Sequence, residues 1–185
     1  GYAEILKHSL IKNKKFFLFL SKNLKNILNL ENKFITKAII ESCKIKKQII
    51  EKDEKETNLR KTLNLGHTFG HAYEATLNYS KKLNHGEAVL YGIFSAAQFS
   101  KKFNFLNNND YKLLISHLSN LGFVDLNKFF SKKHLNKIVN FMIFDKKNDT
   151  KKINLIILKK IGKVNISNQF YVEEIKKFIN SNLLK

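Results

Sequence analysis

The sequence predicts a mainly α-helical domain with at most a small β-hairpin. Apolar residues recur every three or four positions over most of the chain, which is the period of an amphipathic helix. Only short apolar stretches near the C-terminus are compatible with strands. At 185 residues, the chain has the size of one ordinary domain and can bury a real core.

The first half of the chain should contain three helices before a charged turn. Residues 2–11 form an amphipathic pattern, and residues 16–30 (FFLFLSKNLKNILNL) are strongly apolar. Residues 34–52 should form the third helix, with Cys43 as a small buried residue on it. The second of these helices should pack in the core through a stripe at helical spacing, namely Phe16, Leu20, Leu24, Ile27 and Leu28.

In the second half, residues 88–103 should form a buried helix, and residues 111–121, 126–141 and 172–184 should form amphipathic helices. Residues 153–158 (INLIIL) and 163–166 can pair as a hairpin. A continuation of core helix is the alternative, because apolar runs this short are ambiguous. His117 and His134 lie outside every motif and are expected at the surface.

Charge and cysteine content restrict the class of protein. The formal net charge is +19, which is typical of proteins that bind nucleic acid or anionic surfaces. The lysines, however, are scattered as pairs along the chain and do not gather in one tail or helix face, so we expect no nucleic-acid partner. Cys43 is the only cysteine, which excludes an intrachain disulfide and favours the cytoplasm. No signal peptide or membrane span is predicted, since the apolar residues 89–99 are interrupted and too few.

Residues 60–87 (RKTLNLGHTFGHAYEATLNYSKKLNHGE) carry the densest group of titratable side chains. His67 and His71 are four residues apart, so on a helix both rings project from one face. Glu74 continues this face, and His85 follows after a polar loop. Such a pair can hold a metal or flank a substrate. It is no zincin motif, because Thr68 stands where that motif needs a glutamate.

These motifs resemble the 3-dehydroquinate synthase family. The resemblance rests on Arg60, residues 63–72 (LNLGHTFGHA), Glu74 and residues 83–89 (LNHGEAV). Residues 53–57 (DEKET) and residues 3–7 (AEILK) fit the same pattern, so the similarity covers essentially the whole chain. It implies that residues 1–185 are the C-terminal, metal- and substrate-binding helical domain of the dehydroquinate synthase-like fold. The family's N-terminal Rossmann-like domain, which binds NAD, is expected to be absent, since no G-x-G-x-x-G follows a predicted strand.

The resemblance also implies roles for particular residues. Glu4, His67 and His85 would be the ligands of a divalent metal, normally zinc, with cobalt as the other choice. Catalysis would involve His71, Lys7 and Lys46. The substrate would be bound by Lys7, Lys46, Arg60, Asn64, His71 and Lys146, with Lys147 competing for the last position.

From the residues alone, some of these assignments differ. The spacing of His67 and His71 favours both as metal ligands, whereas the resemblance reserves His71 for substrate contact and proton handling. Glu4 and Lys7 alone would be a surface salt pair, and Lys46 a solvated charge. Support roles are expected for the remaining motif residues: orientation of a ligand histidine by Glu74 and Glu87, and close packing or a tight turn at Gly66, Gly70 and Gly86.

The activity implied by the resemblance is that of a phosphate-eliminating carbon-oxygen lyase of the shikimate pathway. It converts 3-deoxy-D-arabino-heptulosonate 7-phosphate to 3-dehydroquinate and phosphate, with NAD and a divalent metal. Another sugar-phosphate cyclase of the same superfamily is the first alternative, and a basic helical nucleic-acid-binding module is the second. A homodimer is expected from the family, and the domain without the NAD-binding half is expected to be inactive.

Overall fold

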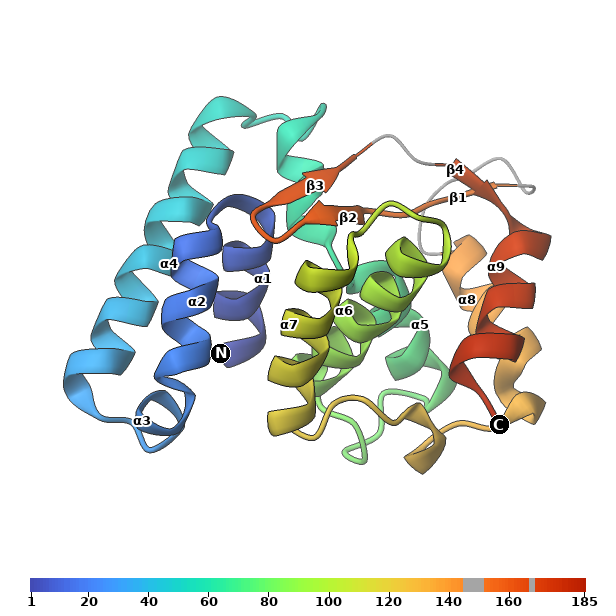
Figure 1. Cartoon of the computed structure of the whole chain (residues 1–185). Coiled ribbons are helices and arrows are strands. Elements are labelled where there is room, and N and C mark those ends of the chain that lie inside the picture. The colour runs from blue at the N-terminus through green and yellow to red at the C-terminus, as the bar shows by residue number, and fades with distance from the viewer. Residues whose placement is uncertain (145–151, 167–168) are drawn as a thin grey trace.

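The computed structural model describes residues 1–144, 152–166 and 169–185, and these residues form a multi-helix domain with two small strand pairs (Figure 1). The prediction of a mainly α-helical fold with little sheet is therefore confirmed. None of the described helices is both long and apolar enough to span a membrane. The elements are α1 (Tyr2–Lys12), α2 (Lys14–Lys22), α3 (Leu24–Leu28), α4 (Asn32–Lys52), the 3-10 helix η1 (Leu59–Asn64), α5 (His67–Thr76), α6 (His85–Lys102), α7 (Asn108–Asn120), the 3-10 turns η2 (Leu126–Lys128) and η3 (Lys132–His134), α8 (Leu135–Phe144), β1 (Lys152–Asn154), β2 (Ile157–Lys160), β3 (Lys163–Asn165), β4 (Gln169–Tyr171), α9 (Val172–Phe178) and the π-helical turn η4 (Ile179–Leu183).

Helix α6 lies at the centre of the domain, and most of its side chains are buried, as predicted for this segment. Helix α5 packs along it, and α8 packs on α5. On the other side, α1 contacts α2, α4 and α6 (Figure 1). Helix α1 therefore lies between the N-terminal helices and the central pair, which brings the start of the chain close to the middle of the sequence.

The strands form two antiparallel pairs. The predicted hairpin is confirmed by β2 and β3, in which Leu158 pairs with Val164. The predicted strand over residues 153–158 is interrupted, because its first part, β1, pairs instead with β4 through Ile153 and Phe170. The hairpin turn is fastened to the helices, since Ile161 N–H donates to Asp110 Oδ2 at 2.9 Å and Gly162 N–H donates to Leu10 O at 2.9 Å.

Three predicted helices are shorter or more broken than the apolar periodicity indicated. The segment 16–30 is divided into α2 and α3 at Asn23, and Leu28, expected in the core, is 50% exposed. Residues 126–141 form two 3-10 turns before α8, because Asp125 Oδ1 accepts the N–H of Asn127 and caps η2. The last helix, α9, changes to a π-helical turn after Phe178.

Cys43 lies on α4 but is exposed, so the prediction that it is buried is wrong. The buried face of α4 is formed by Ala38, Ser42, Ile45 and Ile49, which follow the helical period. Cys43 is one position away from this face. The polar Ser42 therefore points inward, and the sulfur-containing side chain points outward.

His117 is only 3% exposed, so the prediction that it lies at the surface is wrong. Its Nε2 lies 2.8 Å from the hydroxyl of Tyr2, and its Nδ1 lies 3.0 Å from that of Ser21. The ring also packs against Phe17. Burial lowers the pKa of His117 to about 4, so the ring is neutral at pH 7 and joins α1, α2 and α7 by uncharged contacts.

Helices α5 and α6 approach closely because three glycines lie at their contact. A Cβ atom at Gly92 would lie 2.0 Å from Gly66 O and 3.0 Å from Gly70 N. A Cβ atom at Gly70 would lie 3.0 Å from Ala88 O. Close packing at Gly66 and Gly70 was predicted, and Gly92 is the partner that sequence patterns did not reveal. Gly86, in contrast, has open space around it.

Replacing Gly92 by alanine should therefore destabilise the domain strongly. The added methyl group has no room unless the helices separate, and we expect the free energy of unfolding to fall by about 3 kcal/mol or more. Urea unfolding followed by circular dichroism measures this change. Gly86→Ala on the same helix is the matched control and should be neutral or stabilising by about 0.5–1 kcal/mol. Equal stability of the two variants would contradict the packing described.

The buried neutral His117 should make stability depend on pH. Its pKa is about 4 in the folded protein and about 6.5 in the unfolded chain, so the unfolded chain binds a proton that the folded protein does not. The stabilisation is complete above about pH 6.5 and is lost as the pH falls toward about 4, by about 1.4 kcal/mol per pH unit for this group.

In His117→Gln, the slope of unfolding free energy against pH should decrease by this amount between about pH 6 and about pH 5. Part of the slope should persist, because burial also lowers the pKa values of His8 and His67 to about 4. Chemical denaturation at several pH values tests this prediction. Parallel curves for the two proteins would show that His117 does not titrate as described.

Candidate metal centre

In the first turns of α1, a carboxylate and a buried ammonium group face each other. Lys7 is 3% exposed, and its Nζ donates a hydrogen bond to Glu4 Oε2 at 2.7 Å. Burial lowers the pKa of Lys7, which Glu4 offsets only in part. Burial by itself raises the pKa of Glu4, but the hydrogen bond and charge of Lys7, together with His67 and His8, make the net shift downward. Glu4 is therefore an ionised carboxylate at neutral pH.

The two oxygens of Glu4 have different surroundings. Oε2 accepts the hydrogen bond from Lys7, whereas Oε1 is buried and has no hydrogen-bond partner among the described residues. Oε1 lies 3.7 Å from His67 Nε2, on α5. Because buried polar atoms are normally satisfied, this oxygen requires a further explanation.

The tautomer of His67 follows from its other nitrogen. Nδ1 lies 3.3 Å from the carbonyl oxygen of Leu65, which can only accept, so Nδ1 carries the hydrogen and Nε2 presents a lone pair. Burial and the nearby charge of Lys7 lower the pKa of His67 to about 4, so the ring is neutral at pH 7. A lone pair and a carboxylate oxygen thus face each other, an arrangement that a cation between them would stabilise.

The three histidines of the central motif come together as predicted. The ring centroids of His67 and His71 are 5.3 Å apart, those of His67 and His85 are 5.7 Å apart, and those of His71 and His85 are 6.0 Å apart. His67 and His71 lie on α5, and His85 is the first residue of α6. The side chain of His85 is 56% exposed, so the group is accessible from solvent on that side.

The two motif glutamates have separate contacts. Glu74 Oε2 lies 3.0 Å from His85 Nδ1, which fits the expected orientation of a ligand histidine and leaves Nε2 as the nitrogen available to a metal. Glu87 Oε2 instead accepts the backbone N–H of Asn84 at 2.8 Å and so closes the first turn of α6.

Two overlapping sets of ligand atoms can be formed from these side chains. Imidazole and carboxylate groups with open positions suit a catalytic zinc, so the chemistry of the site fits such an ion. One set is Glu4, His67 and His85. In the other, the ligand atoms of His71, Glu74 and His85 all lie within 4.8 Å of one another. Among the described residues, only the second set meets this distance; in the first, Glu4 Oε1 lies 3.7 Å from His67 Nε2, and the ring centroids of His67 and His85 are 5.7 Å apart.

His8 also belongs to this site, although sequence analysis gave it no role. It is 3% exposed, and its Nδ1 lies 2.7 Å from Ser42 Oγ on α4. Its Nε2 is buried, lacks a hydrogen-bond partner among the described residues and lies 3.8 Å from Glu4 Oε2. The available signal was its position four residues after Glu4, on the same face of the helix.

Lys46 extends the positive charge beside these residues. It is exposed on α4, and its charge contributes to the lowered pKa values of both Lys7 and His8. The structure thus places the two predicted lysines near each other, with Lys7 buried at the carboxylate and Lys46 open to solvent.

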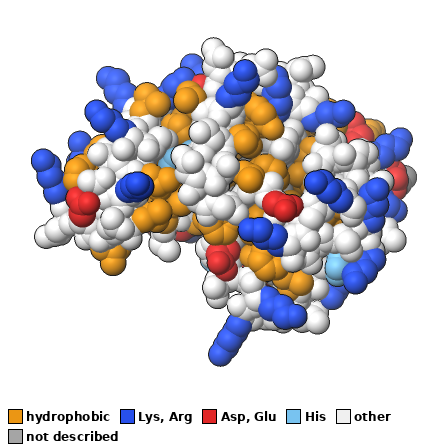
Figure 2. Space-filling model, turned by 60° about the horizontal axis from the view of Figure 1, so that its bottom comes forward, with side chains coloured by type: hydrophobic (Ala, Val, Ile, Leu, Met, Phe, Trp, Pro, Cys, Tyr) orange, Lys and Arg blue, Asp and Glu red, His pale blue; other side chains and the backbone are white. Residues whose placement is uncertain are grey.

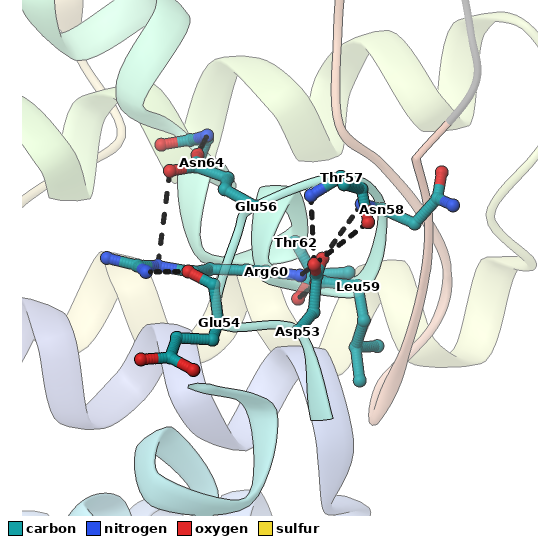
Figure 3. A network of polar contacts seen from close by, with 9 residues as sticks. All are labelled: Asp53, Glu54, Glu56, Thr57, Asn58, Leu59, Arg60, Thr62 and Asn64. Atoms are coloured by element: carbon teal, nitrogen blue, oxygen red, sulfur yellow. Dashed lines mark hydrogen bonds and ion pairs between the residues drawn. The ribbon is translucent and has the colours of Figure 1, made fainter. Parts of the chain in front are cut away.

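Arg60 and Asn64 lie in the segment that joins α4 to α5 (Figure 3). The carboxylate of Asp53 organises this segment by accepting the backbone N–H groups of Arg60, Asn58 and Thr57, and these bonds lower its pKa. Lys146 and Lys147 lie outside the described residues.

The side chains of Arg60 and Asn64 meet at a shared carboxylate. Arg60 Nη1 donates to Glu54 O at 2.7 Å, and its Nε lies 4.0 Å from Glu56 Oε2. Asn64 Nδ2 donates to Glu56 Oε1 at 3.3 Å (Figure 3). An incoming anion would compete with Glu56 for both side chains.

Comparisons with known proteins agree with the sequence motifs. A family model described as 3-dehydroquinate synthase C-terminal matches residues 1–148. A 3-dehydroquinate synthase of Pelagibacter ubique is 54% identical over 100% of this chain and 50% of the relative. One of Dictyoglomus thermophilum is 41% identical over 98% of this chain and 50% of the relative. The chain therefore spans about half the length of the curated relatives it matches.

Solved structures share the fold. A 2-deoxy-scyllo-inosose synthase, complexed with carbaglucose-6-phosphate, NAD+ and Co2+, matches with a TM-score of 0.81 and 24% identity, over 99% of this chain and 52% of that one. A 2-epi-5-epi-valiolone synthase of Streptomyces hygroscopicus, with NAD+ and Zn2+ bound, matches with a TM-score of 0.79 and 18% identity, over 96% of this chain and 48% of that one. With the family model covering the central histidines and the whole of α1, these matches show that the chain belongs to the 3-dehydroquinate synthase C-terminal family.

Proposed function

We propose that residues 1–185 are the metal- and substrate-binding domain of a 3-dehydroquinate synthase. The domain would act with an NAD-binding part to convert 3-deoxy-D-arabino-heptulosonate 7-phosphate to 3-dehydroquinate and phosphate. The observation that carries the proposal is the approach of Glu4 Oε1 to His67 Nε2 at 3.7 Å, where two acceptor atoms face each other. Membership of the family and the 54% identity to a named synthase support the proposed reaction class.

Glu4, His67 and His85 are the proposed metal ligands. Each offers an atom that its protein contacts leave open: Oε1 of Glu4, Nε2 of His67 and Nε2 of His85. The competing set would use Glu74, but this carboxylate already holds His85 Nδ1 at 3.0 Å and is better suited to orienting that ring. The set without Glu74 also gives the buried Oε1 of Glu4 a partner.

A bound zinc or cobalt ion would supply Lewis-acid stabilisation of a ketone oxygen, and NAD would accept and return a hydride, so the overall reaction is redox-neutral. The protein's own groups bind and orient the substrate. Lys7 and Lys46 provide ammonium groups for substrate oxygens, and burial with a lowered pKa lets Lys7 exchange a proton more readily than a solvated lysine.

His71 is proposed as the residue that contacts substrate and moves protons. It lies beside both proposed ligand histidines, with ring centroids 5.3 Å from His67 and 6.0 Å from His85. An imidazole titrates near neutrality and is the usual group for such a role. Arg60, Asn64 and Lys146 are proposed to bind the carboxylate, hydroxyl and phosphate groups, since the arginine fork matches a planar anion.

The alternatives have less support. Another sugar-phosphate cyclase would share the fold, but the structures of that kind are only 18% and 24% identical to this chain. For a nucleic-acid-binding module, Lys and Arg should gather in one patch. On the face drawn in Figure 2, they are scattered among polar and apolar side chains.

Metal content tests the ligand set. The purified chain should bind about one equivalent of zinc or cobalt, and His67→Ala and His85→Ala should each lose it, because each removes one of only three proposed protein ligands. His71→Ala should retain the metal. Elemental analysis after dialysis measures this, with circular dichroism as the control for folding. Loss of metal in His71→Ala with retention in Glu4→Gln would instead support the set that contains Glu74.

Activity requires the part of the protein that binds NAD. Fused to the remaining half of the Pelagibacter ubique relative, the chain should release phosphate from 3-deoxy-D-arabino-heptulosonate 7-phosphate when zinc and NAD are present. Lys7→Met should lower kcat by about 100-fold or more, since it removes a buried charge beside the proposed site. Phosphate release from glucose 6-phosphate instead would favour the alternative cyclase.

A further inference from the structure

We propose that His8 is a positioning residue of the metal centre: a hydrogen-bond relay from Ser42 through His8 holds Glu4 Oε2, so that Glu4 Oε1 faces the metal. This inference rests on the proposed metal site and assigns a role to a residue outside the motif. His8 is 3% exposed, Ser42 is 6% exposed, and the two meet at 2.7 Å between Nδ1 and Oγ.

The direction of the relay follows from what each neighbour can do. The Leu65 carbonyl beside His67 can only accept, which fixes the His67 hydrogen on Nδ1. Ser42 Oγ can donate or accept, and it donates to His8 Nδ1 when His8 carries its hydrogen on Nε2, on the side of the Glu4 carboxylate, which can only accept. The opposite tautomer would bury an Nε2 lone pair against Glu4 Oε2, which, unlike Oε1 beside His67, is not the oxygen proposed to face a metal.

His8 Nε2 lies 3.8 Å from Glu4 Oε2, the oxygen that also accepts from Lys7 at 2.7 Å. This separation exceeds a formed hydrogen bond, so the proposed relay requires the Glu4 side chain to move toward His8. Lys7 Nζ and His8 Nε2 then both donate to the same carboxylate oxygen, Oε2. The other oxygen, Oε1, is left without a donor and faces His67 Nε2 at 3.7 Å.

The relay also connects the site to helix α4. Ser42 belongs to the buried face of that helix, and α4 packs on α1. Fixing the His8 ring from α4 limits the rotamers available to Glu4, four residues earlier on α1. Groups that orient a metal ligand typically change metal affinity about 10- to 100-fold when they are removed.

The first test is the tautomer in the metal-free chain. Long-range 1H–15N spectra of the imidazole rings should show His8 with its hydrogen on Nε2, and the resonance should be assigned by its loss in His8→Gln. A hydrogen on Nδ1 would overturn the relay. This measurement does not depend on metal binding, so it separates the inference from the proposed function.

The second test compares two side chains of similar length and shape. In His8→Gln, the amide can still donate from near the position of Nε2, whereas in His8→Met no donor remains. We expect zinc affinity, measured by chelator competition, to fall about 10- to 100-fold in His8→Met and much less in His8→Gln. Equal affinities in both variants and the parent chain would overturn the proposal, as would equal losses, which would indicate a packing role.

Ser42→Ala tests the remote end of the relay. It should weaken zinc binding by less than His8→Met, and it should add nothing in the His8→Met background, because both act through the same contact. Additive losses would overturn the relay. If the parent chain binds no zinc while His8 has its hydrogen on Nε2, the metal centre is wrong and the role of the relay in it is overturned with it.

Discussion

The close contact between α5 and α6 is the constraint on which the site depends. Gly92 lies so near Gly66 that a Cβ atom there would be 2.0 Å from the carbonyl oxygen. At this separation, His85 at the start of α6 reaches the two histidines of α5, with a ring centroid 5.7 Å from that of His67. A larger residue at the contact would separate the helices and divide the histidine group. The packing of α5 against α6 in the core thus determines whether the three histidines meet.

Burial and charge act together on the groups of α1. With a formal net charge of +19, the chain offers few carboxylates to its many lysines, yet Lys7 is buried against Glu4. The positive charge of Lys7 keeps Glu4 ionised, and it helps to keep His67 and His8 neutral. One anionic oxygen and neutral imidazoles are the forms in which these side chains bind a divalent ion. The buried lysine therefore prepares the site electrostatically.

Periodicity predicted the helical fold, and the spacing of His67 and His71 predicted that these two histidines share a helix face, whereas the place of His85 beside them was implied by the family resemblance. Sequence patterns failed where tertiary contacts decide. Cys43 and Leu28 are exposed since neighbouring residues take the buried face, and His117 is buried because Tyr2 and Ser21 supply its partners. His8 was missed for the same reason: Ser42, its partner, is distant in sequence and becomes visible only when α4 packs on α1.

The site contains two histidine-carboxylate pairs, and they differ in which of the two residues orients the other. Glu74 holds Nδ1 of His85 at 3.0 Å, so a carboxylate orients an imidazole. His8 Nε2 lies 3.8 Å from Oε2 of Glu4, and in the proposed relay an imidazole orients a carboxylate. A ligand held by a fixed neighbour loses less conformational entropy when a metal binds, which makes the free energy of binding more favourable. Preorganisation by both kinds of neighbour accounts for the further polar side chains that lie around the three proposed ligands.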